Sequence, residues 1–115
     1  MKKIVLFAFR GELTCFVHVL LNALDFDARG HEARIVMEGD SVTLVGKLEQ
    51  EQTQFHGLYA KVKGKGLIAG ACKGCSSVLG ATGDVEKAGL PLLDDVMGHP
   101  SMAKWMDDGY TVITF

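Results

Sequence analysis

The sequence predicts an α/β fold in three layers (α/β/α), with helices on both faces of a mainly parallel sheet. Two observations lead to this prediction: short apolar runs alternate with segments of helical periodicity, and glycines or charged residues separate them. Strands that alternate with helices in this way pair in parallel, because each crossover returns the chain to the same end of the sheet. The 115 residues are expected to form a single domain (1–115), since chains of this length rarely divide into two cores.

The chain begins with a strand and a long helix. Residues 3–9 form a continuous apolar run, which is typical of a strand buried on both faces. A helix is expected over 12–29, and Gly30 suits its C-terminal cap. The apolar residues that define this helix recur at steps of three and four: Leu13, Phe16, Val17, Leu20, Leu21 and Leu24. Residues 33–37 are expected to form the second strand.

Shorter and less regular elements follow. Ser41 is expected to cap a helix. The polar tract at 49–54 should be solvated, and a second helical stripe runs over 55–62. A glycine-rich third strand is expected over 66–71, and Cys72 should stand where this strand turns into a short helix.

The last quarter of the chain completes the alternation. A weak strand pattern occupies 90–93. A short helix is expected to follow, with His99 or Gly98 in the cap region, Pro100 in the first turn and Met102, Trp105 and Met106 as an apolar face that ends at Gly109. The β-rich residues 110–115 are expected to form the final strand.

Composition and charge exclude several classes of protein. Twelve Lys and Arg against fourteen Asp and Glu give a net charge of −2, so no nucleic-acid partner is expected. The longest apolar run, Ile4–Phe9, is far shorter than the roughly 20 residues that cross a bilayer. Neither a membrane segment nor a signal peptide is expected, and we predict a cytoplasmic protein.

Three cysteines in a reducing compartment indicate free thiols, catalysis or metal binding rather than a disulfide framework. Two of them are spaced as CxxC directly after the third expected strand. Ligands of open parallel sheets bind at the edge where the carboxyl ends of the strands lie. The residues that follow the first three strands are therefore candidates for one site: Arg10, Glu38, Gly39, Cys72, Lys73, Gly74 and Cys75.

Cys72 is the expected nucleophile of this site. A helix N-terminus and the neighbouring Lys73 both favour a thiolate, so the Cys72 sulfur is expected to be accessible. Cys75 lies one turn later, close enough to trap a mixed disulfide or a persulfide. Alternatively, both cysteines fill a small-residue contact between helix and sheet, where Gly74 makes room. Zinc normally takes four ligands and would need a distant His or a second subunit, so no metal ligand and no cofactor is assigned.

The roles of several other polar residues stay open at this point. Glu38 either hydrogen-bonds a sulfur species or holds Arg10, or it belongs to a simple turn. Cys15 and His18 share a helix face with Asn22, and either line the same edge or form a small buried thiol beside a partly exposed imidazole. His99 is a candidate base in a loop of unknown placement.

Four segments resemble the DsrE/DsrF-like family of small cytoplasmic α/β proteins, which are related to sulfur-relay subunits of the TusD type. The segments are Lys3–Phe7, Val36–Gly39, Gly70–Cys75 and Asp108–Ile113, so the resemblance spans nearly the whole chain. It implies a parallel sheet of about five strands and assembly into trimers or hexamers.

The resemblance also assigns roles to three residues. In sulfur-relay members one cysteine carries a persulfide, and Cys72 matches it by its position after the third strand. Glu38 matches a glutamate that members often place near the thiol. Cys75 departs from the pattern, because those sulfur carriers do not require a second cysteine one turn later, and this leaves open whether the chain passes sulfur or exchanges disulfides.

Three functions are consistent with these residues. In the first, Cys72 accepts sulfane sulfur as a persulfide and relays it between a donor and an acceptor protein, with Cys75 as the second thiol. The second is a CxxC thiol–disulfide redox protein or sensor. The third is a non-enzymatic homo-oligomeric module that binds a small molecule or a metal.

Overall fold

Five parallel strands form the sheet at the centre of the molecule, and they confirm the predicted α/β fold. The computed structural model describes all residues, Met1–Phe115. The strand order is β4-β3-β2-β1-β5, with every neighbouring pair parallel. The strands are β1 (Lys3–Ala8), β2 (Glu32–Met37), β3 (Ile68–Cys72), β4 (Leu92–Leu93) and β5 (Thr111–Thr114).

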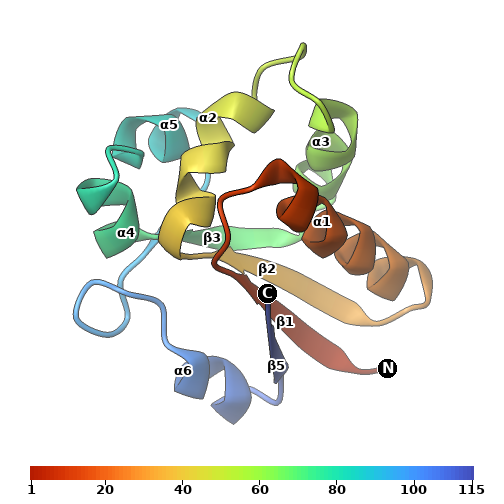
Figure 1. Cartoon of the computed structure of the whole chain (residues 1–115). Helices are drawn as coiled ribbons and strands as arrows, with labels where there is room; N and C mark the ends of the chain where they lie inside the picture. Colours follow the sequence, from red (N-terminus) through yellow and green to blue (C-terminus); the bar gives the residue numbers. More distant parts are fainter.

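Helices cover the two faces of the sheet unequally. Figure 1 shows α1 to α5 on one face and α6 alone on the other. The helices are α1 (Leu13–Ala28), α2 (Leu44–Leu48), α3 (His56–Gly64), α4 (Lys73–Val78), α5 (Thr82–Lys87) and α6 (Met102–Asp107), and a 3-10 helix (Gly39–Thr43) precedes α2. None of these helices combines the length and the hydropathy that a bilayer span requires.

The core is divided by the sheet into a large part and a small part. On the face of α1, the side chains of Ile4 and Leu6 join the main cluster of buried residues. On the other face, Val5, Phe7 and Val36 form a small cluster, against which residues of α6 and β5 pack. β1 is therefore buried on both faces, as its continuous apolar run predicts.

The first helix is confirmed, and its buried stripe is confirmed in part: Phe16 and Leu20 are fully buried as predicted, but Leu21 is not. The fully buried residues are Phe16, Val19, Leu20 and Ala23, whereas Leu21 is 48% exposed. α1 packs against both β2 and α3, and Ala23 belongs to the main buried cluster. Gly30 has a φ of +86° just after the helix, which confirms its predicted role at the C-terminus.

Two predictions about where helices begin are wrong. Ser41 lies inside the 3-10 helix, and its hydroxyl donates to the carbonyl oxygen of Ala8 at 2.8 Å instead of capping α2. The N-cap of α6 is Ser101, whose side-chain oxygen accepts the N–H of Lys104, so Pro100 lies outside the helix. The helix α5 has no counterpart in the sequence prediction.

Candidate functional site

The register of the sheet places Glu38 beside Cys72. β2 and β3 are neighbours, and Met37 pairs with Ala71. The next residues, Glu38 and Cys72, therefore leave the sheet side by side at its carboxyl edge. This juxtaposition agrees with the prediction that polar residues following adjacent parallel strands share one site.

Cys72 occupies the predicted turn from strand to helix. It is the last residue of β3 and the N-cap of α4, and its sulfur accepts the backbone N–H of Cys75 at 3.3 Å. The same turn brings the two thiols of the CxxC motif together on one side of the chain.

His99 completes a cluster with the two cysteines. β4 pairs in parallel with β3, with Leu93 opposite Cys72, so the loop after β4 also starts at the carboxyl edge. The Nδ1 atom of His99 lies 2.9 Å from the sulfur of Cys72 and 3.9 Å from the sulfur of Cys75. Sequence reasoning did not place His99, although the weak strand pattern at 90–93 was the signal that this loop returns to the same edge.

Residues 94–100, here called the His99 loop, are fastened onto α4. The N–H of Gly74 donates to the carbonyl oxygen of Gly98 at 2.8 Å. Val96 and His99 exchange two backbone hydrogen bonds of 2.7 and 2.8 Å within the loop. A Cβ atom on Gly74 would lie 3.0 Å from the His99 ring, so the absence of a side chain at Gly74 permits this close approach.

The prediction that the Cys72 sulfur is accessible is wrong for this structure. Cys72 is 0% exposed, because the His99 loop covers the end of β3. Cys75 is only partly buried, and it lines a shallow pocket of about 260 Å³ together with Gly74, Val78, Leu79 and His99. The second cysteine of the motif is thus the thiol that a ligand meets first.

Burial also determines the protonation of the site. Burial raises the pKa of the Cys72 thiol to about 12; the nearby Cys75 thiol and Glu38 also raise it, and the hydrogen bond from the Cys75 N–H opposes the shift only in part. Burial likewise raises the pKa of Glu38, against the opposing effects of His99 and Cys72. Cys72 is therefore a neutral thiol near pH 7, and the Nδ1 atom of His99 lies within hydrogen-bond distance of it, where an imidazole can exchange a proton with the thiol.

The remaining predicted residues lie around this centre or away from it. The ammonium group of Lys73 lies 3.4 Å from a carboxylate oxygen of Asp94, and the charge of Lys73 is not among the causes that shift the pKa of Cys72. Gly39 has a φ of +53° and opens the 3-10 helix, which packs against α4.

Arg10 lies at a second, separate pocket. It lines this pocket together with Cys15, His18 and Phe115. The amide of Asn22 on the same helix donates to the backbone carbonyl of His18. The Cys15–His18 pair thus faces a different hollow from the CxxC cluster.

Comparison with known protein families identifies the family of this chain. The sequence profile of the DsrE/DsrF-like family matches residues 6–115. The chain belongs to the DsrE/DsrF-like family. The resemblance expected from the four sequence segments is thereby confirmed, and family membership suggests a role related to sulfur relay.

This DsrE/DsrF-like protein is also similar to individual proteins, one by its sequence and two by their structures. The uncharacterized protein MJ0733 of Methanocaldococcus jannaschii is 31% identical over 97 residues, which cover 84% of this chain and 77% of the relative. The solved structure of MTH1491 from Methanobacterium thermoautotrophicum, a protein of unknown function, has a TM-score of 0.73 at 15% identity and full coverage of both chains. BT1422 from Bacteroides thetaiotaomicron, a conserved protein of unknown function, has a TM-score of 0.66 at 22% identity, with 96% of this chain and 94% of that one covered. At these identities the two structures support the fold alone.

Proposed function

We propose that this protein accepts sulfane sulfur as a persulfide on its CxxC pair and passes it to the thiol of a partner protein in the cytoplasm. The observation that carries the proposal is the cluster of two thiols and one imidazole, whose ligand atoms all lie within 4.8 Å of one another. One thiol can hold the sulfur, the second can displace it, and the imidazole can exchange the protons.

The exposure of the two sulfurs supports an order for these steps. The sequence placed the persulfide on Cys72, but Cys75 is the thiol that borders the pocket. A donor persulfide meets Cys75 first: its S–S bond breaks, a new S–S bond forms on Cys75, and the Cys75 proton leaves through His99 to the departing donor thiolate. Transfer to an acceptor thiol repeats this exchange and restores the Cys75 thiol.

Cys72 provides a second route by which the bound sulfur can leave Cys75. Its sulfur attacks the Cys75 sulfur, the Cys75 S–S bond breaks, and hydrogen sulfide leaves with the two protons of the thiol and persulfide. The product is a Cys72–Cys75 disulfide, and the electrons lost by the two cysteine sulfurs reduce the sulfane sulfur. No outside oxidant is required, and a cellular thiol reduces the disulfide afterwards.

Intact-mass spectrometry tests the proposal directly. Reduced protein is incubated without air with inorganic polysulfide, and the wild type and Cys15→Ser are expected to gain one sulfur atom. Cys75→Ser should not load, whereas Cys72→Ser should load and keep the sulfur for longer. A wild type that gains no sulfur contradicts the proposal, and loading that requires Cys72 but not Cys75 contradicts the order of the steps.

A thiol–disulfide redox protein is the second candidate, because the same two sulfurs are close enough for a disulfide to form after a small shift. Glutathione disulfide, used in place of polysulfide, distinguishes the two functions. A redox protein loses two hydrogen atoms in mass under these conditions without any sulfur donor. A pair whose reduction potential is too low for the cytosolic glutathione pool to oxidise would contradict this candidate.

A further inference from the structure

Two cysteine sulfurs and one imidazole nitrogen form a potential set of metal ligands. Cys72 and Cys75 come from the β3–α4 turn, and His99 comes from the loop after β4. The sequence alone gave only two ligands in CxxC spacing and no partner for them. The fold supplies a distant histidine, whose Nδ1 atom lies 2.9 Å from one sulfur and 3.9 Å from the other.

We propose that Cys72, Cys75 and His99 bind one zinc ion, whose fourth coordination position faces the pocket beside Cys75. Bonds of about 2.3 Å to sulfur and about 2.0 Å to nitrogen in a tetrahedron place neighbouring ligand atoms roughly 3.5 to 3.8 Å apart. The observed separations lie on both sides of this range and within 4.8 Å. The cluster therefore needs side-chain adjustments of only about 1 Å to surround the ion.

The backbone holds the two ligand-bearing segments together before any metal arrives. The hydrogen bond from Gly74 to Gly98 joins the residue between the cysteines to the residue before the histidine. The paired backbone hydrogen bonds of Val96 and His99 shape the loop that presents the imidazole. A preformed ligand arrangement reduces the ordering that metal binding would otherwise require.

The donor atoms favour zinc over hard cations. Two thiolates and one imidazole suit soft or borderline ions, whereas magnesium and calcium prefer oxygen ligands. Both cysteines bind as thiolates, so two protons leave as the ion binds, and the two negative charges balance the charge of the cation. Glu38, buried beside Cys72 and near His99, is placed to orient the ligands from outside the coordination sphere.

The number of ligands indicates a site that still reacts with a further group. Closed structural zinc sites have four protein ligands, whereas sites with three leave a position for water or a substrate. Here the open side is the pocket lined by Cys75, Val78, Leu79 and His99. A small sulfur anion or a thiolate is the class of ligand that matches both the soft metal and this largely apolar lining.

A metal titration of the reduced full-length protein tests the site. The protein is treated with dithiothreitol and a chelator, desalted without air, and titrated with Zn²⁺ in competition with a chromophoric chelator. The wild type should bind one zinc ion per chain and release two protons. Co²⁺, used as a spectroscopic substitute, should give the thiolate-to-metal charge-transfer band and the intense visible bands of tetrahedral coordination.

Three variants decide between this site and unspecific binding. Cys75 and His99 are not fully buried, so Cys75→Ser and His99→Ala test the ligands without opening the core, and each should weaken zinc binding by at least about tenfold. Cys15→Ser, which removes the thiol outside the cluster, should bind like the wild type. No zinc binding, unchanged affinity in Cys75→Ser or His99→Ala, or a cobalt spectrum without the thiolate band overturns the proposal.

Zinc binding and sulfur loading use the same thiols but are measured separately. The metal titration contains no sulfane sulfur, and polysulfide loading is measured on protein freed of metal. A failed zinc titration therefore leaves the sulfur-loading result intact, and the reverse also holds. If both succeed, the zinc-loaded protein should gain no sulfur until a chelator removes the ion.

Discussion

Cys72 and Cys75 lie one helical turn apart but have different surroundings. Cys72 is completely covered, and its sulfur contacts the imidazole of His99 and the N–H of Cys75. Cys75 borders a pocket that is open to solvent. A nucleophile has to be both reachable and deprotonated, and Cys72 meets neither condition, because it is covered and its pKa is raised.

The two thiols should therefore react with alkylating agents at very different rates. With a Cys72 pKa of about 12, only on the order of one Cys72 in ten thousand is a thiolate at pH 8. In metal-free Cys15→Ser protein, iodoacetamide should modify Cys75 at least about tenfold faster than Cys72. Peptide mapping of a time course measures both rates, and equal rates would contradict the burial of Cys72.

A substitution at Gly74 should displace the His99 loop without changing either cysteine. A methyl group in Gly74→Ala would press against the His99 ring and the carbonyl oxygen of Gly98, so the His99 loop should move away from α4. We expect alkylation of Cys72 to become several times faster, by roughly threefold or more. Gly83→Ala is the matched control, because Gly83 lies in the similarly short α5 with open space around its Cα atom. Equal effects of the two substitutions would contradict this account.

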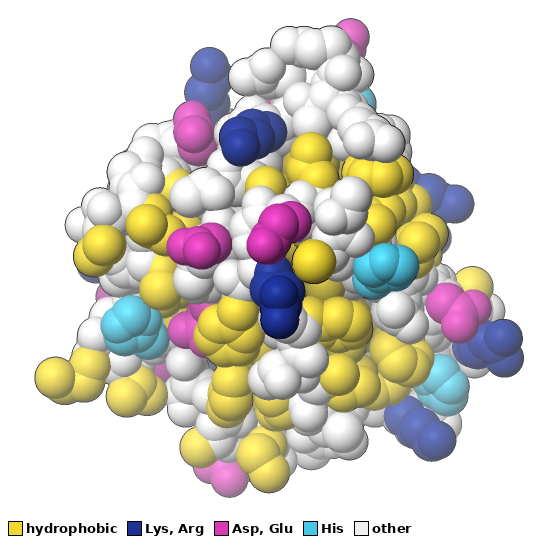
Figure 2. All heavy atoms as spheres, viewed as in Figure 1, with side chains coloured by type: hydrophobic (Ala, Val, Ile, Leu, Met, Phe, Trp, Pro, Cys, Tyr) yellow, Lys and Arg dark blue, Asp and Glu magenta, His cyan; other side chains and the backbone are white.

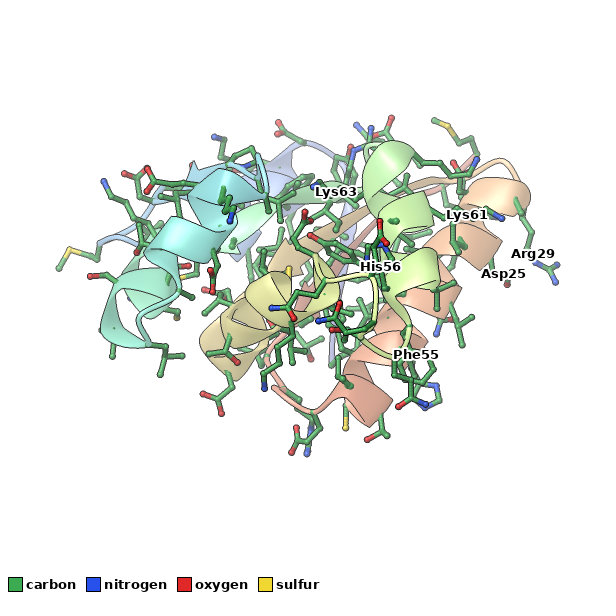
Figure 3. All side chains as sticks on the ribbon, turned by 90° about the horizontal axis from the view of Figure 1, so that it is seen from above. Asp25, Arg29, Phe55, His56, Lys61 and Lys63 are labelled. Carbon is green, nitrogen blue, oxygen red and sulfur yellow. The ribbon has the colours of Figure 1, made fainter.

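At the scale of elements, α3 is attached to the rest of the molecule by a small polar network. The hydroxyl of Tyr59 donates to the carboxylate of Glu49, and the ammonium of Lys63 donates to the same oxygen at 2.8 Å. Figure 3 shows Lys63 and His56 on this helix. The Asp25–Arg29 ion pair, which points outward from α1 in the same view, is not part of this network. Glu49 thus joins the start of the polar tract to the helix that follows it.

This network predicts a loss of stability at acid pH. Burial raises the pKa of Glu49, but hydrogen bonds from Lys63 and Tyr59 lower it by more, so its pKa lies below the usual 4.5. A lowered pKa in the folded state stabilises the fold above the ordinary pKa, and this contribution is lost as the pH falls through the folded-state value.

Urea unfolding of Glu49→Gln measures this contribution. The free energy of unfolding at pH 7 should fall by about 1 kcal/mol or less, because the ion pair is partly exposed and screened. The difference from the wild type should shrink as the pH falls below the folded-state pKa. Glu51→Gln, in the same polar tract, is the control and should behave like the wild type at every pH. A Glu49→Gln variant that matches this control at pH 7 would refute the role of the network.

The elements that sequence reasoning found and missed differ in how much apolar surface they bury. β1 and α1 carry long apolar patterns and were predicted to within about two residues. α5 was missed because it buries only Val85 and contains Gly83, so neither periodicity nor propensity marks it. Ser41 was misplaced as a cap because its true partner, the Ala8 carbonyl, lies 33 positions away.

The candidate site was likewise predicted only in part. Cys72, Cys75 and Glu38 follow predicted strands, so parallel topology alone brings them to one edge. His99 depends on where β4 lies, and strand order cannot be derived from local patterns. The burial of Cys72 was also beyond the sequence, because it results from a loop that closes over the cysteine from 26 positions away.

At the scale of the whole molecule, the outer strand of the sheet is poorly covered. β5 lies at the end of the strand order and pairs only with β1. Ile113 pairs with Leu6 and is 37% exposed, and Figure 2 shows hydrophobic side chains gathered in the lower half of the face around the C-terminus. Exposed edge strands with apolar side chains favour association with another chain.

We therefore expect the protein to form homo-oligomers, such as the trimers or hexamers that the family resemblance implies. Light scattering during size-exclusion chromatography should give a multiple of 12.4 kDa. Ile113→Lys should reduce the mass, whereas Thr111→Lys, on the same face of the same strand, is the matched control and should have a smaller effect. A wild type that stays at the mass of one chain at high concentration would contradict the expectation.

The hydrogen bond between Gly74 and Gly98 has a consequence for any partner of this protein. A molecule too large to pass beside Cys75 reaches the inner sulfur only after the His99 loop, which that bond holds to α4, has moved, and the imidazole then moves with the loop. The Cys72 thiol therefore loses its cover and its proton acceptor in the same movement. The frequency of this opening depends on residues that never touch sulfur, such as Asp95, which holds the far end of the loop through Ser101 and Lys104.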